Sequence, residues 1–240
     1  MHSTTERPSF LTQRRTLIYA LIAGVIVYVL WNIPQLDFIV YPLRLFVTFV
    51  HETAHGLAAL ITGGQIDRLQ VFANGAGVAT TRGGIRWIII PAGYLGAAAF
   101  GAGLFYVINR FGNVKRISIV LGILTALVAI LFTNLLSTAF LIGLGIAALL
   151  IGIGIKAHED IALLVLDVLA IITGLNAVLD LFSLSRSIHM SVGSVRNDAV
   201  AFSAQVAPII PPVIWALLWS ALAVLMLGAA VYYTFIKRKF

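Results

Sequence analysis

The sequence contains no cysteine and few charged residues. Without cysteine there can be no disulfide, no thiolate metal ligand and no cysteine nucleophile, so any metal must be bound by histidine and carboxylate groups. Only 10% of the 240 residues are charged, 60% are hydrophobic, and the mean hydropathy is +1.03. Soluble domains are about a quarter charged, so this composition predicts a polytopic membrane protein. The sequence lacks the interleaved aromatic and basic residues that indicate a nucleic-acid-binding surface. The net charge of +7 is therefore better suited to lipid head groups than to nucleic acid.

The length bounds the architecture. At about 20 residues per membrane span, the chain has room for six or seven helices and for no additional soluble domain. We expect an all-α fold with a disordered basic tail at residues 1–15 and a single integral-membrane domain at 16–240, whose first span, 16–33, is retained. With seven spans, Lys and Arg divide evenly between the two sides, so the positive-inside rule gives no orientation. An even number of spans, with one re-entrant segment, would place the basic ends of the chain together.

The remaining segments follow from hydropathy and turn residues. Between the second and third spans, residues 66–72 and 77–81 alternate partly, with Asn74-Gly75 between them, which predicts a small membrane-associated β-hairpin. Its free edge could accept an extended substrate peptide, or the segment could be a plain connecting loop. The other expected elements are a span at 87–108, two helices within 117–157 that turn near Thr133-Asn134, a span at 161–184, a polar loop at 185–206 and a last span after Pro212. The polar cluster His158-Glu159-Asp160 is interpreted as the N-terminus of the 161–184 span rather than as a metal site.

One motif stands out against the apolar background. His51-Glu52-Thr53-Ala54-His55 lies inside a helical run at 41–62, where Pro42 suits the first turn. Residues four apart on a helix project from one face, so His51 and His55 can bind one zinc ion. Glu52, beside the first ligand, can then act as general base on the water that the metal holds. The alternative is a set of polar side chains satisfied by neighbouring helices, although polar groups at this depth are costly without a function.

A catalytic zinc ion normally takes three protein ligands, so a third must come from another span. Asn176 and Asp180 are four residues apart and share a helix face, which favours Asp180 as the ligand, with Asn176 beside it to bind substrate or orient the site. Asp180 could instead be an interfacial carboxylate at a helix end. This interpretation leaves Asp167 as an unexplained buried acid and Asp198 as a loop residue.

Together these motifs resemble the site-2-protease family, and within it the short bacterial peptidase M50B-like branch. The resemblance rests on His51–His55, on Gly63-Gly64, on residues 91–96 (Pro-Ala-Gly-Tyr-Leu-Gly) and on residues 176–180 (Asn-Ala-Val-Leu-Asp). It implies an intramembrane zinc metalloprotease of a bacterial cell membrane, with zinc on His51, His55 and Asp180 and with Glu52 as base. The implied substrates are membrane proteins with a transmembrane segment. The family's usual Leu-Asp-Gly is Leu-Asp-Leu here, at residues 179–181.

Two other functions fit the same residues. A metal or proton transporter could use the His/Asp site, but it would need polar residues leading to both membrane faces, and the chain has few. A catalytically idle membrane scaffold would gain nothing from Glu52, because a binding-only site does not need a base beside its ligand.

Overall fold

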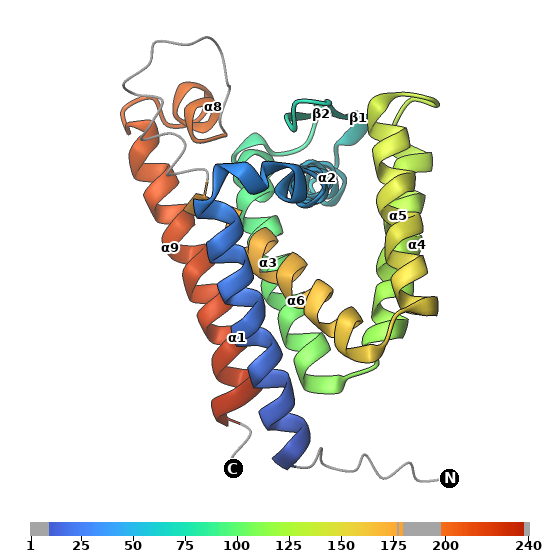
Figure 1. Cartoon of the computed structure of the whole chain (residues 1–240). Helices are drawn as coiled ribbons and strands as arrows, with labels where there is room; N and C mark the ends of the chain where they lie inside the picture. The colour runs from blue at the N-terminus through green and yellow to red at the C-terminus, as the bar shows by residue number, and fades with distance from the viewer. Residues whose placement is uncertain (1–9, 177, 180–197, 238–240) are drawn as a thin grey trace, which may run out of the picture.

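A computed structural model describes residues 10–176, 178–179 and 198–237, and about 80% of it is helical (Figure 1). The elements in chain order are α1 (Phe10–Asn32), a short 3-10 helix η1 (Pro34–Leu36), α2 (Asp37–Ile61), β1 (Gln65–Val71), β2 (Gly77–Arg82), α3 (Arg86–Phe111), α4 (Val114–Phe132), α5 (Thr138–Lys156), α6 (Glu159–Gly174), α8 (Asp198–Gln205), α9 (Pro212–Val231) and a terminal π-helical turn η2 (Tyr232–Ile236).

Several predicted boundaries change. Helix α1 begins at Phe10, so residues 10–15 are helical where a disordered tail was expected. Helix α2 begins at Asp37, which places Pro42 inside the helix instead of in its first turn. The division of 117–157 into two helices is confirmed. His158 is the N-cap of α6 and accepts from the backbone N–H of Asp160, so this cluster is a helix terminus.

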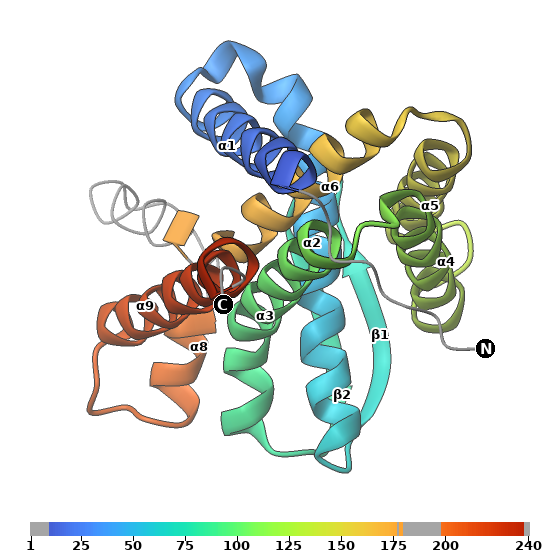
Figure 2. The ribbon, with the colours of Figure 1, turned by 90° about the horizontal axis from the view of Figure 1, so that it is seen from below.

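Helix α2 lies across the other helices. In Figure 1, α1, α4, α5 and α9 run along the vertical, whereas α2 is seen end-on; Figure 2, turned by 90°, shows α2 lengthwise beside the hairpin. Helix α3 contacts α2, α6 and α9, while α4 and α5 pair as a helical hairpin on the other side of α2. The His51–His55 motif therefore lies on a crosswise helix and not on a second span parallel to the others.

Four helices among the described residues are long and apolar enough to cross a membrane: α3, α4, α5 and α9 extended through η2. The 19 residues of α4 and of α5 correspond to about 28 Å, close to the thickness of a bilayer core. Large apolar side chains on these helices are exposed, among them Leu131, Leu141 and Leu225. The chain is an integral membrane protein, and the expected six to seven spans are not confirmed.

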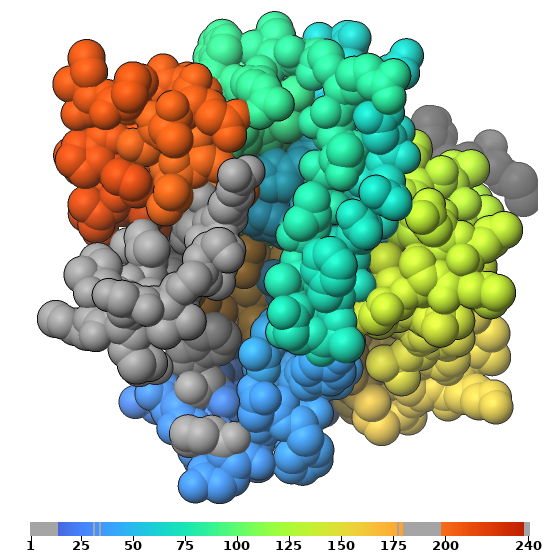
Figure 3. All heavy atoms as spheres, turned by 90° about the horizontal axis from the view of Figure 1, so that it is seen from above, coloured from blue at the N-terminus to red at the C-terminus, as the bar shows by residue number. Residues whose placement is uncertain are grey.

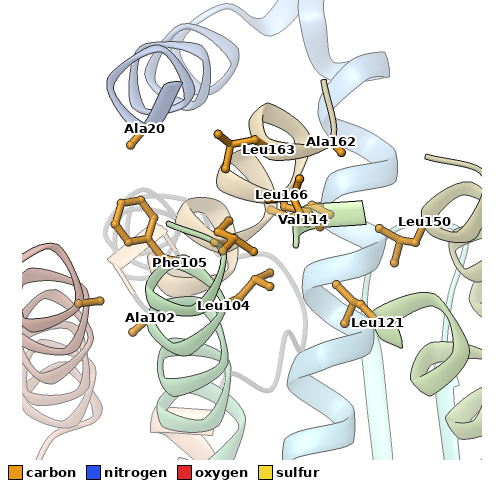
Figure 4. Close-up of a cluster of buried hydrophobic side chains, with 14 of the residues drawn as sticks. Ala20, Ala102, Leu104, Phe105, Val114, Leu121, Leu150, Ala162, Leu163 and Leu166 are labelled. Carbon is orange, nitrogen blue, oxygen red and sulfur yellow. The ribbon is translucent and has the colours of Figure 1, made fainter. Parts of the chain in front are cut away.

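The largest apolar cluster among the described residues joins seven helices, α1 to α6 and α9; Figure 4 shows part of it. Ala20 of α1, Phe105 of α3 and Leu166 of α6 are buried in it, together with residues of α4 and α5. Small residues let α3 approach α6 closely, since a β-carbon on Gly101 would collide with the α6 backbone at Ala170 and Gly174. This packing fixes α6 against α3, and both helices reach the end of the bundle where α2 lies.

The predicted β-hairpin is confirmed as a two-stranded antiparallel sheet that lies along α2. Gly75 turns the chain with φ +89°, a conformation that favours glycine. The tip is held to the first half of α2, because Tyr41 Oη donates to the carbonyl of Ala73 (2.6 Å) and Thr48 Oγ1 donates to that of Gly75 (2.8 Å). Near the other end of α2, Gly56 makes room for Ile66 of β1. The hairpin therefore covers most of the length of α2.

Asp167, unexplained in the sequence, pairs with Asn109 between α6 and α3. Its side chain is fully buried, and Asn109 Nδ2 donates to Asp167 Oδ1 at 2.6 Å. Asn109 Oδ1 and Asp167 Oδ2 find no partner among the described residues. A carboxyl group buried in an apolar interior and opposed by no cation favours its neutral, protonated form.

We expect Asp167→Asn to be tolerated better than Asp167→Leu. Asparagine keeps an acceptor for Asn109 Nδ2, whereas leucine removes it and leaves this buried donor unpaired at a cost of about 1–3 kcal/mol. Thermal unfolding of the purified protein in one detergent measures the difference. Equal losses in the two variants would contradict this account of the pair.

Candidate metal centre

His51 and His55 lie one turn apart on α2 and face each other. Their Nε2 atoms are 3.1 Å apart, and the two rings meet edge to face with centroids 4.8 Å apart. His55 is buried, and the side chain of His51 is only 12% exposed. As expected for residues four apart on a helix, the Nε2 atoms of the two imidazoles lie close together on one face of α2.

A carboxylate from outside α2 completes the group. Asp198, the first residue of α8, places Oδ2 at 2.9 Å from Nε2 of His51 and 3.1 Å from Nε2 of His55. Burial raises the pKa of the Asp198 carboxyl, but while no metal is bound the charges of the protonated His55 and His51 outweigh this effect and hold its pKa below the usual range. Asp198 is therefore ionised, as a metal ligand must be.

These three atoms fit a zinc ion. Ligand atoms at about 2.0–2.1 Å from a tetrahedral zinc lie about 3.3 Å from one another, close to the 2.9–3.1 Å found here. Asp198 Oδ2 is buried and has no assigned hydrogen-bond donor among the described residues. Two histidines and one carboxylate, with a fourth position left open, are the donor set of catalytic zinc sites. His51, His55 and Asp198 could hold this metal.

Aromatic packing brings α8 to the histidines. Phe202, one turn after Asp198, meets Trp215 and Trp219 of α9 with ring centroids 4.7 and 5.6 Å away. Trp219 also packs on Tyr94 of α3, and Tyr94 meets the ring of His51 edge-on at 4.8 Å. The position of Asp198 is thus set by contacts that reach it through α9 and α3.

Gly93 of α3 provides the space that the site occupies. A β-carbon on this residue would collide with Nε2 of both His51 and His55. One turn further, Gly96 faces Ala54 of α2, where a β-carbon would come within 2.6 Å of the Ala54 methyl group. The two glycines of the 91–96 segment therefore let α3 approach α2 closely and leave room at the histidines.

Each histidine has a second partner on its other nitrogen. His55 Nδ1 donates to the backbone carbonyl of Ile89 in α3 at 2.7 Å, which leaves Nε2 with its lone pair. His51 Nδ1 lies 3.3 Å from the side-chain amide of Asn176, just beyond α6. With the amide oxygen turned toward His51, Nδ1–H donates and Nε2 is again free to bind a metal; the oxygen and nitrogen of an amide exchange by rotation.

Glu52 lies between α2 and the hairpin. It is buried, and a β-carbon on Gly77 of β2 would come within 2.6 Å of its Cγ and Oε1 atoms. The backbone N–H of Ala79 interacts with its carboxylate. Glu52 follows His51 directly, so the carboxylate is adjacent to the histidine pair without being part of the three-residue group.

The structure brings together four of the five residues proposed from the sequence: His51, Glu52, His55 and Asn176. Asp180, the predicted third ligand, lies outside the described residues. Asp198 was expected in a polar loop and is instead the first residue of a helix, at the histidines. An acidic residue followed by Ala199 and Phe202 at helical spacing could have indicated this short amphipathic helix.

We expect Gly93→Ala to lower zinc affinity by more than about 100-fold, beyond the loss typical of residues that only support a ligand, because the added methyl group displaces both imidazoles. The control is Gly103→Ala in the same helix, where a β-carbon meets nothing within 4 Å. Zinc content after dialysis against a graded chelator measures both variants. Full zinc retention in Gly93→Ala would rule out a metal at this position.

The third ligand is tested by two matched substitutions. Asp198→Ala should lose zinc, because two imidazoles alone hold it weakly, whereas Asp180→Ala should retain it. Metal analysis of both proteins, with their thermal unfolding compared to confirm folding, gives the result. Zinc lost from Asp180→Ala and kept by Asp198→Ala would instead identify Asp180 as the third ligand, as the sequence suggested.

Comparison with known proteins identifies one family. A model of the Peptidase M50B-like family matches residues 19–230, which include all the residues of the site. No curated protein and no solved structure matches the chain.

Proposed function

We propose that this chain, which belongs to the peptidase M50B-like family, is a zinc metalloendopeptidase that hydrolyses peptide bonds in or near the transmembrane segments of membrane proteins. The observation that carries the proposal is the convergence of His51, His55 and Asp198 beside Glu52 inside an apolar protein. Family membership supports a peptidase, and the four apolar helices support action within a membrane.

The metal ligands in this proposal are His51, His55 and Asp198. When bound there, zinc supplies a Lewis acid that polarises the scissile carbonyl and makes water more acidic. The Ile89 carbonyl and the Asn176 amide fix the orientation of the two imidazoles. Asn176, which reaches His51 from the end of α6, has the positioning role that its spacing in the sequence suggested.

Glu52 is the general base. Its carboxylate takes a proton from the attacking water and passes it to the leaving nitrogen. Its burial under β2 keeps bulk water away from the carboxylate. Three residues of the turn and strand above it lack bulky side chains, Gly75, Ala76 and Gly77, so the backbone of the hairpin can approach the base closely.

The hairpin supplies an edge on which a substrate can bind. Strand β1 pairs with β2, and the other edge of β2 lies beside Glu52, as the contacts of Gly77 and Ala79 indicate. A substrate segment that unwinds and adds to this edge would be extended, with its peptide bonds presented to the base. Hydrolysis requires such a segment, because helical peptide bonds are shielded by their own hydrogen bonds.

The two other functions are less well supported. A transporter needs a path of polar residues from the site to both membrane faces. Between α3 and α6, Asn109 and Asp167 form a buried polar pair, but they bond to each other and Asn109 is 20 residues along α3 from Ile89 at the site. A scaffold has no use for a buried carboxylate beside two histidines. Neither accounts for Glu52 as directly as hydrolysis does.

Glu52→Gln should keep its zinc and lose proteolysis. The side chains are isosteric, but glutamine cannot accept the proton, and general-base catalysis contributes about 10²–10⁴-fold. Cleavage of a single-span substrate in proteoliposomes, with zinc measured in the same sample, tests this. Glu159→Gln, at the exposed start of α6, is the control. Near-normal cleavage by Glu52→Gln would exclude the proposed mechanism.

A further inference from the structure

The turn of the β-hairpin is a tightly bonded unit. The N–H of Phe72 donates to the Ala76 carbonyl (2.8 Å), and the N–H of Gly75 donates to the Phe72 carbonyl (2.9 Å). Asn74 Oδ1 accepts from the N–H of Ala76 at 3.0 Å, the side-chain-to-backbone bond by which asparagine closes a turn. Because these hydrogen bonds make the turn one body, a group that holds the turn also holds the start of β2.

Two hydroxyl groups of α2 hold this turn. Tyr41 Oη donates to the carbonyl of Ala73, and Thr48 Oγ1 donates to the carbonyl of Gly75. Tyr41 and Thr48 are seven residues apart, two turns of a helix, so both project from the face of α2 that the hairpin covers. In Figure 3, which looks onto this end of the molecule, the hairpin lies over α2, and atoms of α2 are visible at the floor of a hollow between the hairpin and α8.

The hydroxyl of Thr48 bonds differently from those of other helical threonines. A threonine hydroxyl inside a helix commonly donates to the carbonyl four residues earlier in the same helix. Thr53 of α2 does so to the Phe49 carbonyl (2.7 Å), and Thr125 of α4 does so to the Leu121 carbonyl (2.8 Å). Thr48 instead donates to the hairpin turn, so its bond joins two elements of the structure.

The start of β2 determines the surroundings of the Glu52 carboxylate. Thr48 and Glu52 are one turn apart on α2, and a β-carbon on Gly77 would come within 2.6 Å of both side chains. Two residues further along β2, the N–H of Ala79 interacts with the Glu52 carboxylate. Gly77 is two residues from Gly75, the residue that Thr48 holds, so a displaced turn would change both contacts of the carboxylate.

We propose that Thr48, assisted by Tyr41, is a positioning residue for the general base and acts on it through the hairpin. The two hydroxyls fix the distance of β2 from α2, and β2 fixes the orientation of the Glu52 carboxylate through the N–H of Ala79. A general base must lie about 2.6–3.2 Å from the water that it deprotonates, so a small displacement slows hydrolysis. The anchoring of the turn does not depend on catalysis, whereas its effect on hydrolysis rests on the proposed function.

Two substitutions at Thr48 separate its hydroxyl from its methyl group. Valine keeps the methyl group against Gly77 and removes the hydroxyl, whereas serine keeps the hydroxyl. We expect Thr48→Val to lower kcat for a single-span substrate in proteoliposomes by about 10- to 100-fold, the cost of displacing a reacting group by up to about 1 Å. Thr48→Ser should stay close to the wild type. Both should retain zinc, because the bonds that orient the histidines come from Ile89 and Asn176.

Two further variants complete the series. Thr125→Val is the matched control, because it removes a hydroxyl whose bond lies within α4, and it should leave kcat unchanged. Tyr41→Phe removes the second bond to the turn. We expect a smaller loss of kcat than in Thr48→Val, because the Tyr41 bond is exposed and water can replace the donor. The two substitutions combined should lower kcat further than Thr48→Val does.

Hydrogen exchange reports the anchoring without catalysis. Deuterium uptake of the segment 72–82, followed by mass spectrometry, should be faster in Thr48→Val than in Thr48→Ser, because the turn and the N–H of Ala79 are less firmly held. The same difference should appear in the Glu52→Gln background, where the amide oxygen of the new side chain still accepts from Ala79.

The outcomes distinguish the anchoring from the reaction. Equal exchange in Thr48→Val and Thr48→Ser would overturn the anchoring of the turn. Equal kcat in the two variants, or a loss confined to KM, would overturn the link to Glu52, since the hairpin would then affect substrate binding alone. A wild type that cleaves no peptide bond would contradict the proposed function, and the exchange measurement would still support or overturn the anchoring.

Discussion

Two imidazole nitrogens and one carboxylate oxygen lie about 3 Å from one another inside an apolar protein. Burying such groups costs free energy unless they are paired or bind a metal. The surrounding helices must therefore hold the three groups together in the apolar interior. Helix α2 supplies the two histidines and α8 supplies Asp198. Helix α3 contributes Gly93, which has no side chain where it contacts the two imidazoles. The backbone of the hairpin closes the remaining side over Glu52.

Helix α3 carries much of this arrangement through its small residues. Gly93 faces the histidines, Gly96 faces Ala54 and Gly101 faces α6, all at positions where a methyl group would collide. In a membrane, where apolar side chains gain little by leaving lipid, such close backbone contact is a main source of helix association. The same helix thus binds its neighbours tightly and leaves room for a metal.

The sequence predicts the parts of the site that are local. His51, Glu52 and His55 follow from spacing on one helix, and the hairpin follows from alternation around Asn74-Gly75. Asp198 could not be found in this way, because Phe202 of its own helix packs on Trp219 of α9, and Trp219 packs on Tyr94 of α3, a helix about 100 residues earlier in the chain. The crosswise course of α2 was also missed, since hydropathy reports how apolar a helix is and says nothing of its direction.

The hydrogen bonds that orient the two imidazoles come from two different helices. The Ile89 carbonyl of α3 holds His55, and Asn176, at the end of α6, holds His51. Ile89 and Asn109 are 20 residues apart, about 30 Å along α3, and Asn109 is the residue that binds α6 through Asp167. A sliding of α3 past α6 at that remote pair would turn one imidazole relative to the other. We therefore expect the affinity for a metal at this site to depend on the register of α3 against α6, which is set partly at a pair of residues far from the histidines.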